Sequence, residues 1–408
     1  MTAIAPNLNT SGPLWFARDL SQPEPIPEEG VARATALMQS GRLHRYGETG
    51  GGVPEPSLLE QEYAAYVGAK YCVAMSSCGA TMFVALKALG VQPGDKVLTS
   101  TFTLAPVPGS IAHIGADPVL VETTAEYTTD LDDLAIKAAH SGAKVFLISH
   151  MRGHITDMQA VRAVCDAHGI AVVEDCAHTM GARWDGRFSG TWGAVGCFST
   201  QTYKHINSGE GGLLVTNDED VCAQAILMSG SYMLYSQHTS APGSEVFERW
   251  RYTTPNFSMR MSNYAAAILR PQLLDMPRRI TRWNYLYAQI ERALADVPCL
   301  QVPARDPREE YVASSIQFTL DLDASCIERF LTECDGMGLH IKWFGRNEPQ
   351  GFTSNYTHWQ YMRHAQALPS SLQLMAGLCD MRISLAMSDE DCALIGRIIR
   401  VALAKAAA

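Results

Sequence analysis

The segment 170–216 constrains the fold most, because it places an acid at the end of a buried strand and a lysine on a loop of the same sheet. It begins IAVVED, an apolar run with no polar face, which is typical of a parallel strand buried on both sides. Asp175 ends that run, and a second apolar run, 194–198, leads through Ser199 to Lys204 and a Ser-Gly-Glu-Gly-Gly turn. Ligands bind outside the carboxyl ends of strands in open α/β sheets, so both side chains are predicted at a binding edge.

The same alternation of strand and helix patterns continues with short loops from residue 72 to 216 and predicts a doubly wound, mainly parallel α/β sheet. Residues 1–30 are rich in proline and are expected to form an arm on the body or on a partner subunit. We expect a large α/β domain over 31–270 and a small C-terminal α+β domain over 271–408. Pro271 is expected to interrupt the helical pattern at this division.

Composition excludes several classes of function. Of 408 residues 47% are hydrophobic, enough for a sizeable core, and the net charge of −10 comes without a basic stripe, so nucleic acid is not an expected partner. No leader pattern and no membrane-spanning apolar run occur, which predicts a soluble cytoplasmic protein. The 11 cysteines include no Cys-x-x-Cys pair, and the His150-x3-His154 pair is too isolated from other potential ligands to indicate a metal. No metal site is therefore predicted.

An acid at a strand end and a loop lysine in one sheet meet the requirements of pyridoxal 5′-phosphate (PLP). The lysine amine forms a Schiff base with the aldehyde of this cofactor, and the carboxylate keeps the pyridine nitrogen protonated so that the ring accepts electrons. Lys204 and Asp175 are therefore candidates for these roles. Taken singly, a surface lysine and a helix-capping aspartate are the alternatives.

The spacings Asp175-x-x-His178 and Ser199-x4-Lys204, with the Gly-Glu-Gly-Gly turn, resemble the DegT/DnrJ/EryC1/StrS aminotransferases, which are fold-type-I PLP enzymes. The resemblance is dense over 33–270. It implies transfer of an amino group from an amino acid, glutamate or glutamine, to a keto sugar, keto-cyclitol or other small keto metabolite in sugar or secondary-metabolite biosynthesis. It also implies catalytic roles for Lys204, Asp175 and His178, and a phosphate contact for Ser199.

A turn of small residues, Ser77-Cys78-Gly79-Ala80, joins a predicted strand to a predicted helix. Free backbone N–H groups and the helix dipole at such a turn suit a phosphate group. In the family the corresponding Ser-Gly-Thr turn holds the cofactor phosphate. Here Cys78 and Gly79 occupy the Gly and Thr positions, so the backbone of Gly79 and Ala80 is expected to make the contacts.

Three further residues come from the resemblance. Phe102 is expected to stack on the cofactor ring, although an ungapped match places Leu104 there. Ser258 stands where the family has an asparagine that reaches the cofactor phosphate from the neighbouring subunit, which implies a homodimer with shared active sites. Arg260 keeps the family's arginine, assigned to substrate binding or, alternatively, to an ion pair at the dimer interface.

The chain departs from the sugar enzymes around the substrate. Arg152 replaces a tyrosine of the family, and the 342–359 segment brings Lys342 and Arg346. Because an arginine fork matches a carboxylate, Arg152 is assigned to substrate binding, and the acceptor is expected to be a keto acid or keto-cyclitol and not a nucleotide-linked sugar. The alternative is that Arg152 pairs with a local acid such as Asp157.

Two other classes of function share this fold or this cofactor. Dehydratases of this fold replace the lysine by histidine, whereas Lys204 is retained and His205 is one position away. A PLP-binding regulator without turnover would need a DNA-binding module, and the sequence shows no such module. A glycine-rich segment, 46–53, resembles a loop that lines the family's active site or is a surface loop.

Overall fold

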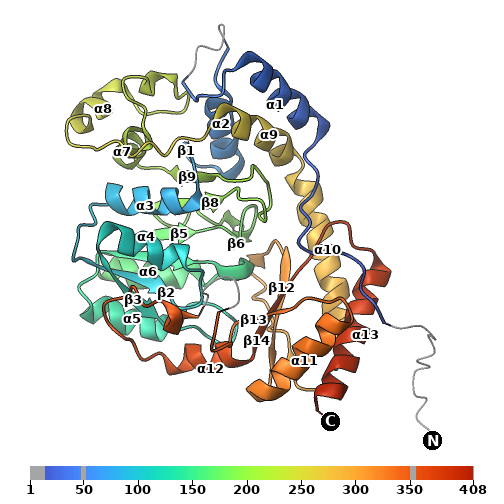
Figure 1. Cartoon of the computed structure of the whole chain (residues 1–408). Coiled ribbons are helices and arrows are strands. Elements are labelled where there is room, and N and C mark those ends of the chain that lie inside the picture. Colours follow the sequence, from blue (N-terminus) through green and yellow to red (C-terminus); the bar gives the residue numbers. More distant parts are fainter. Residues whose placement is uncertain (1–13, 47–51, 350–354, 408) are drawn as a thin grey trace, which may run out of the picture.

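The computed structural model describes residues 14–46, 52–349 and 355–407 (Figure 1). The start of the predicted arm, most of the glycine-rich segment 46–53 and part of the 342–359 segment lie outside the described residues. Within these ranges no helix combines the length and the apolar character needed to cross a membrane.

A seven-stranded sheet forms the centre of the molecule, in the order β1-β9-β8-β5-β4-β2-β3. Only β9 runs antiparallel to its neighbours in this sheet, and the adjacent pairs from β8 to β3 are parallel. The strands are β1 (Tyr71–Met75), β2 (Lys96–Ser100), β3 (Asp117–Val121), β4 (Val145–Ser149), β5 (Ala171–Asp175), β8 (Val195–Ser199) and β9 (Gly212–Thr216). The predicted fold class, a mainly parallel α/β sheet of fold type I, is confirmed.

Helices cover both faces of this sheet, because alternate strand residues point into two different cores. Phe146 and Ile148 join the core beneath α5 (Leu131–His140) and α6 (Met158–Ala167). Val145 and Leu147 join the core beneath α3 (Cys78–Ala88), α4 (Pro106–Ile114) and α7 (Glu219–Ser229). The remaining edge packs against α2 (Glu55–Val67).

A smaller antiparallel sheet, β10-β12-β14-β13, forms the C-terminal part of the chain. Its strands are β10 (Leu300–Gln301), β12 (Ser315–Leu320), β14 (Leu378–Arg382) and β13 (Lys342–Trp343). The helices α11 (Ala324–Gly336), α12 (Pro369–Gly377) and α13 (Asp389–Ala406) accompany it, and η3 (Tyr356–His358) lies between β13 and α12. A third sheet, β11-β6-β7, is formed by β6 (Arg183–Trp184), β7 (Arg187–Phe188) and β11 (Glu309–Glu310).

Long helices connect the two larger sheets. In Figure 1 α1 (Glu28–Ser40) lies along α9 (Asn263–Leu274), and α10 (Met276–Leu294) leads towards the C-terminal sheet. The expected interruption at Pro271 is wrong, since α9 continues through that residue to Leu274. A proline inside a helix removes one backbone hydrogen bond, and the buried residues of α9 on both sides of Pro271 show that packing holds the helix together.

The described part of the N-terminal arm packs on the C-terminal unit. The Phe16 amide donates to the Met337 carbonyl over 2.8 Å, and Arg18 pairs with Asp391 at the start of α13. The arm thereby brings residues 18–21 to the cavity described below.

Candidate active site

Asp175 lies buried at the carboxyl end of β5, where a hydrogen-bond chain fixes its carboxylate. Ser149, its register partner at the end of β4, donates to Asp175 Oδ2 over 2.7 Å, and Thr103 donates to Ser149 over 2.8 Å. The Ala177 amide donates to Oδ1 over 3.1 Å. Two donors, one of them itself held by Thr103, thus keep this acid in one orientation at the predicted edge.

Lys204 reaches the same edge from the loop after β8. Its Nζ lies 2.8 Å from Nε2 of His178, which follows Asp175 by three residues as predicted. Burial, with repulsion from Arg152 and despite attraction from Asp175, lowers the pKa of Lys204 to about 8. Burial and the Lys204 charge also hold the pKa of His178 well below its usual value. A neutral imidazole therefore accepts a hydrogen bond from the lysine ammonium.

The predicted phosphate turn begins α3. Ser77 is the N-cap, and its hydroxyl accepts the Ala80 amide over 3.0 Å. The amides of Cys78 and Gly79, at the first two helical positions, have no carbonyl four residues back within the helix. The structure thus differs from the expectation for Ala80, whose amide is already used for capping, whereas the amides of Cys78 and Gly79 are not used by this cap.

Gly212 sits between this turn and Ser199. It pairs in register with Ser199 on β8 and with Met75 on β1. A Cβ built on Gly212 would lie 2.5 Å from the carbonyl carbon and oxygen of Ser77 and 2.6 Å from the Cys78 nitrogen. Only glycine permits β9 to approach the turn this closely.

We expect Gly212→Ala to lower the free energy of unfolding by about 1–3 kcal/mol, the range for overpacking, because backbone atoms of the turn must move. Urea denaturation measures this change. Gly109→Ala is the matched control. A Cβ added at Gly109 would meet no atom within 4 Å outside the backbone of its own helix, and alanine suits the interior of α4. Equal stability of Gly212→Ala and wild type would contradict the close approach.

Phe102 is placed differently from the expectation. It is buried among Tyr127 and Phe344, with ring centroids 6.0 and 5.2 Å away, and its amide donates to Thr123. Leu104, at the position of the ungapped match, lines the cavity from this loop. The loop after β2 turns Phe102 inward because a phenyl ring gains more than leucine from burial against other rings.

Ser258 and Arg260 lie beside the phosphate turn but do not line the cavity of their own chain. The Ser76 amide donates to the Met259 carbonyl over 2.9 Å, which fixes the segment at the end of β1. Arg260 donates to the Gly230 carbonyl over 3.0 Å, and its guanidinium lies over Tyr232. Ser258, with a φ of 56°, bonds through its amide to Asn256.

A cavity of about 730 Å³ opens above Lys204 and His178. Its other walls come from the N-terminal arm, the loop after β2 and the C-terminal sheet: Arg18, Asp19, Leu20, Ser21, Leu104, Ala105, Arg152, Tyr203, Lys342, Trp343, Phe344, Arg346, Asp380 and Arg382 are among its lining residues. The cavity therefore lies between the two larger sheets.

Arg152, on the 3₁₀ turn η1 (Met151–Gly153) after β4, lines this cavity and forms an ion pair with Asp380 at 2.8 Å. The alternative that it pairs with Asp157 is wrong, because Asp157 instead pairs with Arg308 at 2.9 Å. Arg152 has a left-handed φ of 56°, and Asp157 caps α6 through its side chain.

Sequence reasoning missed Ser149, Asp380 and Arg382. Ser149 was predictable from the sequence, because it is the last residue of β4 just as Asp175 is the last residue of β5. Asp380 and Arg382 stand two residues apart on β14 and so share a face. That face meets the cavity only through the packing of the C-terminal sheet, which no local pattern reveals.

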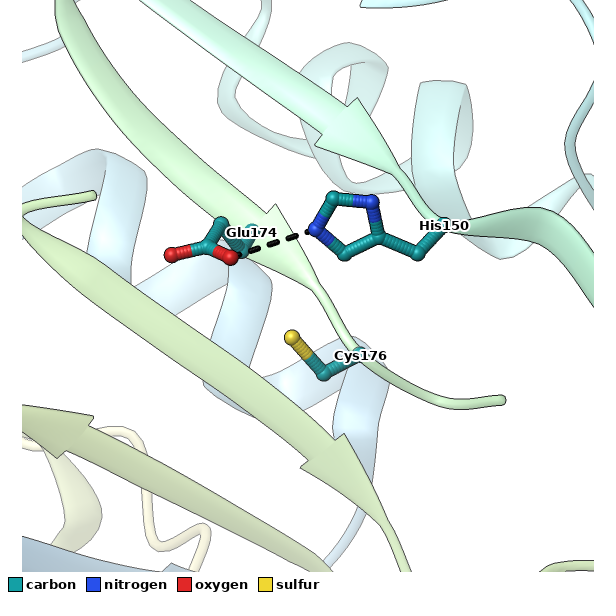
Figure 2. Close-up of side chains that lie close together, drawn as sticks. All are labelled: His150, Glu174 and Cys176. Carbon is teal, nitrogen blue, oxygen red and sulfur yellow. Dashed lines mark hydrogen bonds and ion pairs between the residues drawn. The ribbon is translucent and has the colours of Figure 1, made fainter. Parts of the chain in front are cut away.

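Behind Asp175, Glu174 points to the other side of the strand and lies close to His150 and Cys176 (Figure 2). Its carboxylate accepts the Gly190 and Gly193 amides at 2.8 and 2.7 Å and lies 3.2 Å from His150. Burial, with repulsion from Glu174, raises the pKa of Cys176 well above its usual value, so the thiol stays protonated. Glu174 and His150 form a hydrogen-bonded support for the strand end, and the Cys176 thiol bonds to Ser189.

Comparison with known proteins gives one family. The model of the DegT/DnrJ/EryC1/StrS aminotransferase family matches residues 25–400. The spore coat polysaccharide biosynthesis protein SpsC of Bacillus subtilis is 32% identical over 281 residues, covering 68% of this chain and 69% of that protein. A putative L-glutamine:3-amino-2,3-dideoxy-scyllo-inosose aminotransferase of Micromonospora echinospora is 30% identical over 288 residues, covering 69% of this chain and 65% of the relative.

The fold is also found among solved structures. The aminotransferase TlmJ of Streptoalloteichus hindustanus superposes with a TM-score of 0.81 at 22% identity, covering 95% of this chain and 99% of TlmJ. At this identity the likeness concerns the fold.

Proposed function

Because the chain belongs to the DegT/DnrJ/EryC1/StrS aminotransferase family, we propose that it moves an amino group from an amino-acid donor to a keto sugar, keto-cyclitol or other small keto metabolite. It is a PLP-dependent aminotransferase. The observation that carries the finer proposal is the Lys204 amine, 2.8 Å from His178 and facing the cavity at the edge where Asp175 ends its strand.

The described residues fit PLP. Asp175 would face the pyridine nitrogen, and the amides of Cys78 and Gly79 with the Ser199 hydroxyl would hold the phosphate at the start of α3. The close packing of Gly212 on Ser77 supports this assignment, because the missing side chain of Gly212 leaves the backbone of the turn room to adopt this position. Leu104 is proposed to contact the ring in place of Phe102.

When bound, PLP supplies an electron sink that stores the amino group between two half-reactions. We assign the proton transfers at the substrate carbon to Lys204 Nζ, which is the amine that faces the cavity beside His178. His178 Nε2 accepts a hydrogen bond from this nitrogen and so orients it. The lowered pKa of Lys204 keeps more of the amine in the neutral form that can take up a proton.

This pKa gives a pH prediction. An amine must be neutral to add to an aldehyde, and a pKa of about 8 leaves about a tenth of Lys204 neutral at pH 7. The rate of PLP capture by cofactor-free protein should therefore rise with pH up to about 8 and then level off. Stopped-flow absorbance between pH 6 and 10 measures it. A rate that keeps rising to pH 10 would show an amine with an ordinary pKa.

We further propose a homodimer with shared active sites. Ser258 and Arg260 lie next to the phosphate turn yet outside their own cavity, an arrangement that suits contact with a second chain. Tyr232, beneath the Arg260 guanidinium, and the adjacent Met233 are 62% and 88% exposed, and exposed apolar side chains gathered at one place suit an interface. Light scattering should give twice the chain mass. An active, stable monomer would refute the shared site.

One experiment tests the central proposal. Incubation of the PLP-loaded protein with L-glutamate and no acceptor should release 2-oxoglutarate once per site, with loss of the cofactor's aldehyde absorbance. Borohydride reduction before the donor is added, followed by peptide mapping, should label Lys204. Elimination of water from a sugar without release of 2-oxoglutarate, or a label on another lysine, would contradict the proposal.

A further inference from the structure

Three cations and one carboxylate gather on the C-terminal wall of the cavity. Lys342 on β13 is the register partner of Asp380 on β14, and Arg382 is two residues further along the same strand face. Arg152 reaches them from the other sheet through its 2.8 Å ion pair with Asp380. We call Arg152, Lys342 and Arg382 the cationic cluster.

Among the described residues, Asp380 is the carboxylate that the two arginines of the cluster share. It also accepts the Gln317 amide over 2.7 Å. Arg152 is 10% exposed, and its Nε has no hydrogen-bond partner among the described residues. The guanidinium of Arg382 lies over the Tyr203 ring at 4.1 Å. A buried donor without a partner costs free energy, so such an arrangement suits an acceptor that arrives from outside.

Repulsion within the cluster supports this interpretation. Burial, followed by repulsion from Arg152, lowers the pKa of Lys342 to about 7, and the same two causes lower the pKa of Arg382. Arg152 also holds a left-handed backbone, which is uncommon for a residue other than glycine. Strain and like charges kept together in a cavity are typical of binding sites.

The cluster faces the reacting amine. Arg152 and Arg382 line the same cavity as Lys204 and His178. Burial lowers the pKa of Lys204 and of His178, and the charges of both arginines lower these pKa values further. An anion held between the arginines would therefore lie close to the carbon that reacts at Lys204. In an amino acid the group next to that carbon is its carboxylate.

We propose that the cationic cluster is a carboxylate subsite, which binds the acid group of the substrate whose amino or keto carbon lies at Lys204. The inference rests on the proposed aminotransfer for the identity of this cavity. Two arginine forks match a carboxylate in geometry as well as charge. The acid group comes from the amino donor, from an acidic acceptor, or from both in turn, and the experiment below separates these sources.

Binding without turnover is the first measurement. Titration calorimetry of the PLP-loaded protein with glutarate should give dissociation constants about 10- to 100-fold higher for Arg152→Gln and for Arg382→Gln than for wild type, the range for hydrogen bonds to charged groups. Arg278→Gln is the control, because Arg278 is exposed and pairs with Asp275 on the surface. Unchanged glutarate affinity in both cluster variants would overturn the proposal.

Thermal stability separates binding from a structural role. Removing a charge that burial and repulsion from Arg152 disfavour should leave the Tm of Arg382→Gln unchanged or higher, whereas loss of a structural cation would lower it. Lys342→Gln provides a second variant in case one arginine variant folds poorly, and it too should weaken glutarate binding. A lower Tm with wild-type glutarate affinity would assign the cluster to structure.

Half-reactions identify the source of the acid group. With L-glutamate, Arg382→Gln should slow the single turnover about 10-fold or more, while a donor amine without a carboxylate should react as in wild type. Comparing 2-oxo acids with neutral cyclitol ketones in the reverse direction tests the acceptor in the same way. Equal slowing of charged and uncharged substrates would show that the cluster acts on Lys204, which overturns the proposal. If wild type transfers no amino group but glutarate affinity still depends on the arginines, the aminotransfer fails and the subsite stands.

Discussion

Lys204→Ala is expected to reduce amino transfer from L-glutamate by about 10⁴-fold or more, because the variant loses both the covalent attachment and the proton carrier. The side-chain nitrogen of Lys204 bonds to His178 alone among the hydrogen bonds of the described residues, so the fold should persist. Mass spectrometry of the aminated product over time measures the rate, and circular dichroism checks the fold.

The matched control is Lys70→Ala, since Lys70 is exposed ahead of β1 and far along the chain from the cavity loops. It should transfer amino groups at the wild-type rate. Retention of about a tenth or more of wild-type activity by Lys204→Ala would remove this lysine from the reaction, whatever the control shows.

Asp175→Asn should reduce transamination by about 10²-fold or more, the effect of losing one key electrostatic group. A carboxylate holds a proton on the pyridine nitrogen, and an amide of the same shape does not. Ser149 can still donate to the amide oxygen, so the melting temperature should change little. Stopped-flow measurement of the glutamate half-reaction gives the loss.

Asp166→Asn serves as the control for this substitution, because Asp166 is an exposed partner of Arg162 on α6. Its half-reaction should match wild type. Should Asp175→Asn react within a factor of a few of wild type while still folded, the acid at the end of β5 would have another role.

The sequence predicted the parts of the site that depend on local pattern. Asp175 and Lys204 follow apolar runs, and buried parallel strands are recognised by such runs, so their meeting at one edge followed from sheet topology alone. The turn at Ser77 was likewise predicted, although the use of the Ala80 amide by its own cap depends on a side-chain rotamer that no pattern specifies.

What could not be predicted depends on contacts between distant segments. Phe102 and Leu104 both follow β2, and the rings of Tyr127 and Phe344 decide which of them is buried. Arg152 pairs with Asp380, more than two hundred residues away, in preference to the nearby Asp157. Which residue is buried and which acid forms the ion pair depend on the packing between the two sheets. That packing is the sum of many contacts between segments that are distant in the sequence.

The bonds around Glu174 have a consequence for its neighbour. A strand shifted by one residue exchanges its two faces, and such a shift of β5 would replace Asp175 at the cavity edge by a longer acid. The amides of Gly190 and Gly193 and the His150 ring hold Glu174 on the far face and so oppose the shift. Glu174 thus determines that Asp175, and not Glu174 itself, lies at the cavity edge. Substitutions at Gly190 or Gly193 would therefore change the reaction without contacting the substrate.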